Sequence, residues 1–165
     1  MHVEVDAAIE IARAAAGFEW SWTVADLEPF CRALGWQMSR RGEKSAILIT
    51  GLAIDRAEAV VFLDGSRIRE ILVWVSDIAD SVDAAVGSAV VGGFEAIQSR
   101  LVEEFGLPPR MTFDEEPSSG WDLPRVVLIM SATLRSLCVS LINPESQRAR
   151  DEPVDAPGTW GAKIS

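Results

Sequence analysis

The chain has 165 residues, 48% of them hydrophobic, and its 25 acidic and 15 basic residues give a net charge of −10 at pH 7. This length and composition predict one well-packed domain, and no run of 18 apolar residues is present that would suit a membrane-spanning helix. Because nucleic acid and anionic membranes carry the same sign of charge, we expect neither as a partner.

The first predicted element is a helix over residues 7–16, AAIEIARAAA. Asp6 precedes this helix at the position of an N-cap, and Gly17 follows it where a left-handed C-cap favours glycine. The preceding residues are acidic, whereas a secretory signal begins with a positively charged region. We therefore expect a cytoplasmic protein.

A second helix is predicted over residues 26–34, before a glycine. Thr23 and Asp26 resemble a capping box, or Asp26 alone is the cap. Just ahead, Trp20 and Trp22 flank one serine, which places both indoles on one side of an extended segment. These tryptophans are either binding anchors or packing residues, and packing is the more common role.

Four strands are predicted next, because short runs rich in β-forming residues are separated by turn sequences. The turns are residues 41–44 and 64–66, and the second contains the Asp-Gly pair typical of hairpins. Such short connections predict an antiparallel meander. The runs are residues 36–41, 45–50, 58–63 and 67–75.

Apolar residues recur every three or four positions over residues 81–105, which predicts a long helix. Gly92 and Gly93 weaken it, so we expect a kink or a close approach to the sheet near residue 92. Gly106 and the prolines after it end the helix.

The remaining chain is predicted as an acidic loop over residues 113–121, followed by strands over residues 125–130 and 134–142. In the last strand apolar residues alternate with Ser and Cys, which predicts one buried and one more polar face. The pattern α-α-β-β-β-β-α-β-β predicts an α+β domain over residues 1–145, with helices on one face of a mostly antiparallel sheet of about six strands. Residues 146–165 are predicted to be a flexible tail.

The residue types argue against catalysis. The single histidine is His2, and tyrosine is absent, so the usual general base and commonest metal ligand is confined to the chain end. Cys31 and Cys138 have no histidine to activate them, and we interpret them as reduced, packed thiols. Glycine spacings of nucleotide-binding loops and the spacing of an EF-hand are also missing. We expect no enzyme activity, no cofactor and no metal.

The charge is unevenly distributed along the chain. Residues 77–122 contain ten acidic residues and two arginines, a net charge of −8, whereas residues 32–69 carry +3. A basic protein surface is the partner that suits the acidic segment, although ordinary solubility charge explains it equally well. The candidate contact residues lie on two loops: the acidic loop with Asp114, Glu115 and Glu116, and the hairpin tip with Asp64, Gly65, Ser66 and Arg67.

One sequence pattern resembles a known family. WSWT at residues 20–23, Asp26-Leu27, LGW at residues 34–36 and FGLP at residues 105–108 are similar to a family of small actinobacterial proteins of unknown function. Proteins of this kind look like immunity factors for secreted toxins, such as the NAD-degrading tuberculosis necrotizing toxin. The resemblance implies a non-enzymatic protein that binds a cognate toxin in a 1:1 complex and occludes its active site.

Two other functions remain open from the sequence. The first is a chaperone-like adaptor for a secreted protein, which would hold a peptide on the polar face of the sheet. The second is a hydrolase that uses Asp114, Glu115 or Glu116. Adjacent carboxylates in a Pro/Ser/Gly loop are more often solvated than catalytic, so we expect the hydrolase least.

Overall fold

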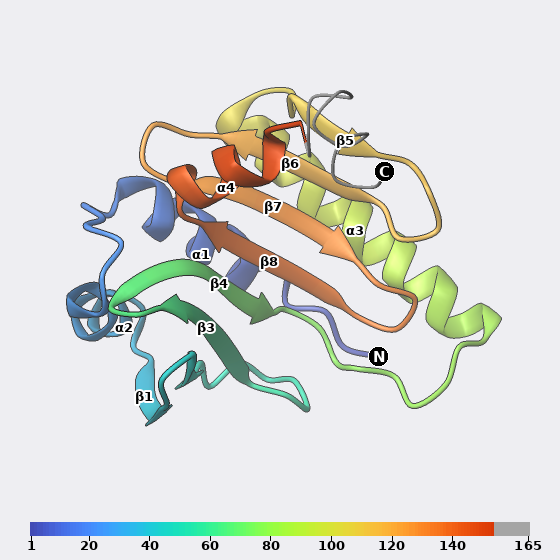
Figure 1. Ribbon diagram of the computed structural model, residues 1–165. Coiled ribbons are helices and arrows are strands. Elements are labelled where there is room, and N and C mark those ends of the chain that lie inside the picture. Colours follow the sequence, from blue (N-terminus) through green and yellow to red (C-terminus); the bar gives the residue numbers. More distant parts are fainter. Residues whose placement is uncertain (154–165) are drawn as a thin grey trace, which may run out of the picture.

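The predicted four-stranded meander forms half of a larger sheet. The computed structural model describes residues 1–153 and contains one eight-stranded sheet, in the order β1-β2-β3-β4-β8-β7-β6-β5 (Figure 1). Every neighbouring pair of strands is antiparallel. The strands are β1 Gln37–Arg41, β2 Ser45–Ile49, β3 Glu58–Asp64, β4 Arg67–Trp74, β5 Arg110–Thr112, β6 Ser118–Asp122, β7 Val127–Ala132 and β8 Leu137–Ile142.

The expectation of about six strands was wrong by the two strands β5 and β6. Strand β5 directly precedes the predicted acidic loop of residues 113–121, and β6 takes up the last four residues of that loop. The β6 sequence, SSGWD, contains few β-forming residues, but it pairs with β7 from Ser118↔Ser131 to Asp122↔Val127. Strand formation depends strongly on the neighbouring strand, so the partner supplies what the local sequence lacks.

Within residues 1–153, four α-helices accompany the sheet: α1 Val5–Gly17, α2 Leu27–Leu34, α3 Ala84–Phe105 and α4 Pro144–Asp151. A 3₁₀ turn, Val24–Asp26, leads into α2. Helices α1 and α3 pack on one face of the sheet, whereas α4 lies on the other (Figure 1). The prediction that helices cover one face alone was therefore wrong for α4. The first part of the predicted tail is also helical, and residues 154–165 lie outside the described part of the chain.

The start of α1 is set by the sheet and not by a side-chain cap. The helix begins at Val5, and Asp6 lies inside its first turn. The Glu4 amide donates a hydrogen bond to the Val75 carbonyl, at 2.8 Å. Gly17 does not adopt the predicted left-handed conformation. In contrast, Gly35 ends α2 with a left-handed φ of 72°, as favoured at that position.

Strand β8 is at the centre of the core. All six of its residues are buried, so the predicted polar face is buried as well. Helix α3 runs unbroken through Gly92 and approaches β8 closely at Gly93. A Cβ atom at Gly93 would lie 2.7 Å from Cδ1 of Leu137. The predicted close approach is therefore confirmed, one residue beyond the expected position. No helix within residues 1–153 is long and apolar enough to span a membrane.

Candidate functional site

The acidic hairpin, residues 113–117, is the turn that joins β5 to β6 at one edge of the sheet. Hydrogen bonds fix its base. The Ser118 amide donates to Oγ1 of Thr112 at 3.0 Å, and the Ala132 amide donates to the Pro117 carbonyl at 2.9 Å. The turn is thus attached both to its own strands and to the end of β7.

Two of the three predicted carboxylates also shape the turn. Oδ1 of Asp114 accepts a hydrogen bond from the Glu116 amide at 2.9 Å, the local closure that Asp favours in turns. Oε2 of Glu116 accepts one from the Leu134 amide at 3.2 Å, in the loop between β7 and β8. Glu115 forms no hydrogen bond or ion pair within residues 1–153 through its carboxylate. The hairpin therefore presents its charges on an ordered backbone.

The tip of the acidic hairpin combines charge with an exposed aromatic ring. Phe113 is 82% exposed and Leu134 is 44% exposed. Asp114, Glu115 and Glu116 are exposed as well, and together with Leu134 they line an open hollow of about 610 Å³. Sequence analysis identified the carboxylates but missed Phe113 and Leu134. An aromatic residue directly before three acids is a signal that could have identified the first of these.

The second predicted contact loop, residues 64–67, is held in place by its neighbours. The Ser66 carbonyl accepts a hydrogen bond from the Val24 amide at 2.9 Å. Arg67 forms an isolated bridge with Thr23 and an ion pair with Glu145 at 2.7 Å. Gly65 supplies a φ of 62° to the tight turn between Asp64 and Ser66. This hairpin tip is less free than its sequence suggests.

The two predicted loops lie at opposite ends of the strands. Ser118, beside the acidic hairpin, pairs with Ser131, and Ser131 pairs with Cys138. Cys138 in turn faces Trp74, the last residue of β4. The 64–67 turn instead lies at the other end of β4, which begins at Arg67. The fold therefore does not bring the two groups of candidate residues together.

The WSWT segment, residues 20–23, is a structural clamp. The carboxylate of the buried Asp26 accepts hydrogen bonds from the Ser21 amide, the Ser21 hydroxyl and the Trp22 amide, at 2.9, 2.9 and 2.7 Å. These bonds hold Trp22 at a φ of 57°, a conformation that costs a bulky residue energy. Asp26 therefore occupies the predicted N-cap position of α2, but its side chain closes this loop and makes no cap hydrogen bond to the helix.

The tryptophans of the clamp pack against each other and against the fold. Trp20 and Trp22 are stacked, with ring centroids 4.2 Å apart, so their indoles share one side as predicted. Nε1 of Trp22 donates to the Arg125 carbonyl at 3.0 Å. The Trp22 carbonyl accepts from the Ile68 amide at 2.7 Å. The packing interpretation of this motif is therefore confirmed for Trp20 and Trp22.

The cysteines are unsuited to nucleophilic chemistry. Cys31 and Cys138 are both free and buried. Burial raises the pKa of the Cys31 thiol, and it raises the pKa of Cys138 to about 11. Both thiols therefore stay protonated near neutral pH, whereas the reactive form is the thiolate. Within residues 1–153, no group of three His, Cys, Asp or Glu side chains is arranged to hold a metal ion.

Comparisons with known proteins give a family but no activity. The family model described as "Family of unknown function (DUF6301)" matches residues 6–143. No curated protein matches the chain. Among solved structures, the crystal structure of a DUF4309 family protein (YjgB) from Bacillus subtilis subsp. subtilis str. 168 is similar at 16% identity, with a TM-score of 0.46. The similarity covers 84% of this chain and 97% of that chain.

Proposed function

The chain belongs to the DUF6301 family of unknown function, and we propose that it is a non-enzymatic immunity protein that binds a cognate secreted toxin domain. In this proposal the acidic hairpin enters the active-site cleft of the toxin and occludes it in a 1:1 complex. The sequence resemblance favours an NAD-degrading toxin as the partner.

The observation that supports this proposal most is the combination of groups at the acidic hairpin. Phe113 is 82% exposed beside three exposed carboxylates on an anchored turn. Aromatic side chains are enriched at the centre of protein interfaces, and charged groups at the rim set the partner and the encounter rate. A solvated surface without a partner has no need of an exposed phenylalanine at its most acidic point.

The charge of the hairpin suits the proposed target. An enzyme that binds NAD presents cationic groups to the pyrophosphate, and the carboxylates of Asp114, Glu115 and Glu116 provide matching negative charge. Opposite potentials raise association rates by about 10–10³-fold. An immunity protein benefits from such rapid capture, because it must reach its toxin before the toxin acts.

The first experiment is co-expression with the protein encoded by the neighbouring gene. We expect the neighbour to arrest growth when expressed alone, and this chain to restore growth and co-elute with it at 1:1 in gel filtration. A harmless neighbour, or a toxin that does not co-elute with this chain, contradicts the proposal. The same complex then serves for the assignment of the contact surface.

The second experiment tests the acidic hairpin by stopped-flow association between 0.1 and 1 M salt. The variant Asp114→Asn with Glu115→Gln and Glu116→Gln should associate at least tenfold more slowly at 0.1 M salt and depend less on salt, because the Debye length falls from about 10 to 3 Å over this range. The matched control replaces three exposed acids on α1 and α3 with Gln: Glu10, Glu95 and Glu103. Equal slowing in both variants would mean that net charge alone acts.

A substitution at Phe113 tests whether the hairpin also supplies an apolar anchor, independently of electrostatic steering by the carboxylates. We expect Phe113→Ala to speed dissociation at least tenfold and to leave the association rate nearly unchanged, because truncation of a buried interface aromatic typically affects the dissociation rate. Met111→Ala, which removes another exposed apolar side chain of the same region, is the control. Unchanged dissociation of the Phe113 variant would exclude the hairpin from the interface centre.

The same preparations distinguish the alternatives that the sequence left open. An adaptor should bind an unfolded or terminal segment of a secreted protein, whereas an immunity protein should bind only the folded toxin domain. A hydrolase should turn over substrate in isolation and lose that activity when Asp114, Glu115 and Glu116 are replaced.

A further inference from the structure

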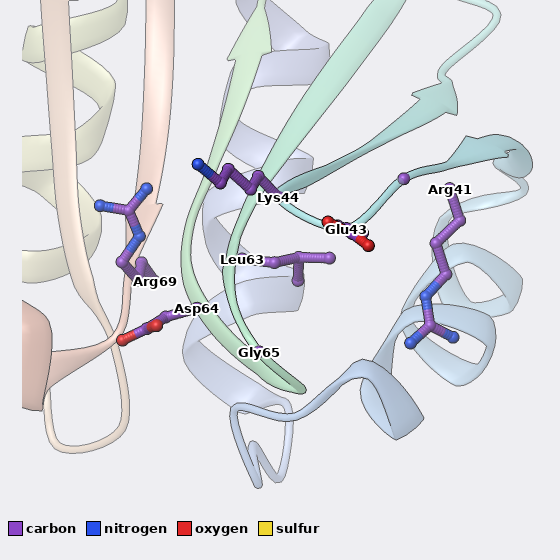
Figure 2. Close-up of a pocket in the computed structure, with 8 residues that line it drawn as sticks. Arg41, Glu43, Lys44, Leu63, Asp64, Gly65 and Arg69 are labelled. Carbon is purple, nitrogen blue, oxygen red and sulfur yellow. The ribbon is translucent and has the colours of Figure 1, made fainter.

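A second charged surface lies at the opposite end of the strands from the acidic hairpin. It is an open hollow of about 940 Å³ between the β1–β2 and β3–β4 turns, here called the basic hollow. Its cations are Arg41, Lys44 and Arg69, and Glu43 and Asp64 also line it. Lys44 and Arg69 extend toward the same side of the hollow, and Arg41 points away toward α2 (Figure 2).

Two irregularities in the sheet shape the basic hollow. The pairing of β1 with β2 shifts between Met38 and Arg40, so one extra residue precedes the basic end of β1. The pairing of β3 with β4 shifts between Phe62 and Leu63, which leaves Arg69 as the extra residue of β4. Bulges redirect side chains and are common beside functional sites. Here the two bulges flank one hollow, and one of them carries a lining cation.

The lining charges of the basic hollow are not neutralised within the described chain. Arg67 and Arg150 nearby form ion pairs with Glu145 and Glu70. In contrast, Arg41, Lys44 and Arg69 form no ion pair with any carboxylate of residues 1–153. A chain with a net charge of −10 has ample acid to pair with these cations. Their exposure together leaves them available to an external carboxylate.

The hollow suits a protein surface better than a phosphate. Phosphate sites use free backbone amides, but the amide of Gly42 already donates to Ser45 and that of Leu63 to Lys44, at 2.8 and 2.9 Å. Glu43 and Asp64 would also repel a bare polyanion, whereas a protein surface of mixed charge can match both signs. The net charge of the chain further disfavours nucleic acid.

We propose that the basic hollow is a second binding surface, which takes an acidic segment of a protein partner mainly through Lys44 and Arg69, with Arg41 lining its other side. The basic hollow and the acidic hairpin occupy opposite ends of the strands and different halves of the sheet. The occupant of the hollow is therefore an acidic segment of a second protein partner. This inference does not rest on the proposed toxin.

The test is a titration of the full ¹⁵N-labelled chain with a ten-residue peptide of alternating Glu and Ala, at low salt. We expect saturable amide shifts confined to residues 41–45 and 63–69. The triple variant Arg41→Glu with Lys44→Glu and Arg69→Glu should bind at least tenfold more weakly. A control with the same change of charge, Arg125→Glu with Arg135→Glu and Arg148→Glu, should stay within twofold of the unmodified chain.

Three results would overturn the proposal: shifts that do not saturate, equal weakening in both triple variants, or tighter binding of pyrophosphate or oligo(dT) than of the peptide at the same amides. The last result would assign the hollow to phosphate chemistry. The residues of both triple variants are exposed, so circular dichroism and thermal melting should match the unmodified chain. If the 41/44/69 variant does not fold, single Arg69→Gln and Lys44→Gln changes should each weaken peptide binding at least twofold.

Discussion

The two loops that the sequence offered as contact sites differ in how the fold holds them. The 64–67 turn is fixed by the WSWT clamp, by backbone hydrogen bonds to Val24 and Trp22 and by the Arg67–Glu145 ion pair. The acidic hairpin is held by hydrogen bonds at its base and by the Asp114 and Glu116 side chains, and it leaves Phe113 82% exposed. The turn sequences alone favoured the two loops almost equally as contact sites, but the hydrogen bonds and ion pairs that hold each loop differ. The backbone of the 64–67 turn is bound on several sides, whereas the acidic hairpin presents an aromatic ring and its charges to solvent, as recognition loops commonly do.

Removal of the Asp26 carboxylate should have the largest effect on this contrast. Asp26→Ala leaves the amides of Ser21 and Trp22 without their acceptor, and hydrogen bonds to a charged group contribute about 1.5–3 kcal/mol each. We expect a loss of about 3 kcal/mol in the free energy of unfolding, measured by urea titration of tryptophan fluorescence. Asp26→Asn, which keeps one acceptor oxygen, should lose less. Equal losses would show that the clamp depends on charge and not on acceptor geometry.

A pair of glycines tests how α3 supports the half of the sheet that carries the acidic hairpin. A Cβ at Gly93 would meet Leu137 at 2.7 Å and Val3 at 3.1 Å, whereas a Cβ at Gly92 would meet nothing within 4 Å. Gly93→Ala should destabilise the protein by about 1–3 kcal/mol through overpacking. Gly92→Ala should stabilise it by up to about 1 kcal/mol through helix propensity. Thermal denaturation of the two variants measures the contrast directly.

Acid should weaken the hairpin side through Asp151 of α4. Arg110 of β5 lowers the pKa of Asp151 to about 2 from its ordinary 3.8, chiefly by hydrogen bonding. Because the pKa is lower in the folded state, the stabilisation is complete above about pH 4 and disappears as the pH falls through about 2. The stability difference between the unmodified chain and Asp151→Asn should therefore shrink over this range. For Asp80→Asn, an exposed acid without an ion pair in residues 1–153, the difference should not change.

The smallest effect on stability is expected at the acidic hairpin itself. Replacing Asp114, Glu115 and Glu116 by amides should change the free energy of unfolding by less than about 0.5 kcal/mol, because these side chains are exposed. The same substitutions are predicted to slow association with a toxin at least tenfold. A loss of stability comparable to that of Asp26→Ala would make the hairpin a structural element and remove the contrast between the two loops.

Local sequence signals predicted much of the fold. The meander β1–β4 was predicted from alternating runs and an Asp-Gly turn, and α3 from its apolar periodicity; both are present. Strands β5 and β6 were missed because the sequence SSGWD has low strand propensity, and its strand conformation depends on pairing with β5 and β7. Helix α4 was missed because its sequence, PESQRARD, is polar. Two ion pairs attach it to strands far away in the sequence: Asp151 to Arg110 of β5, and Arg150 to Glu70 of β4.

For the candidate site, the sequence by itself determined which groups are available: one histidine, two cysteines without a base and a charge of −10 with its densest acids at residues 114–116. The tertiary structure alone decided how they are presented. It turned Asp26 from a predicted helix cap into the centre of the WSWT clamp, exposed Phe113 beside the acids and brought Arg41, Lys44 and Arg69 to one hollow. Composition and periodicity record local preference, whereas these placements depend on strand register and on contacts such as those of Trp22 with Arg125 and Ile68, which join residues far apart in the chain.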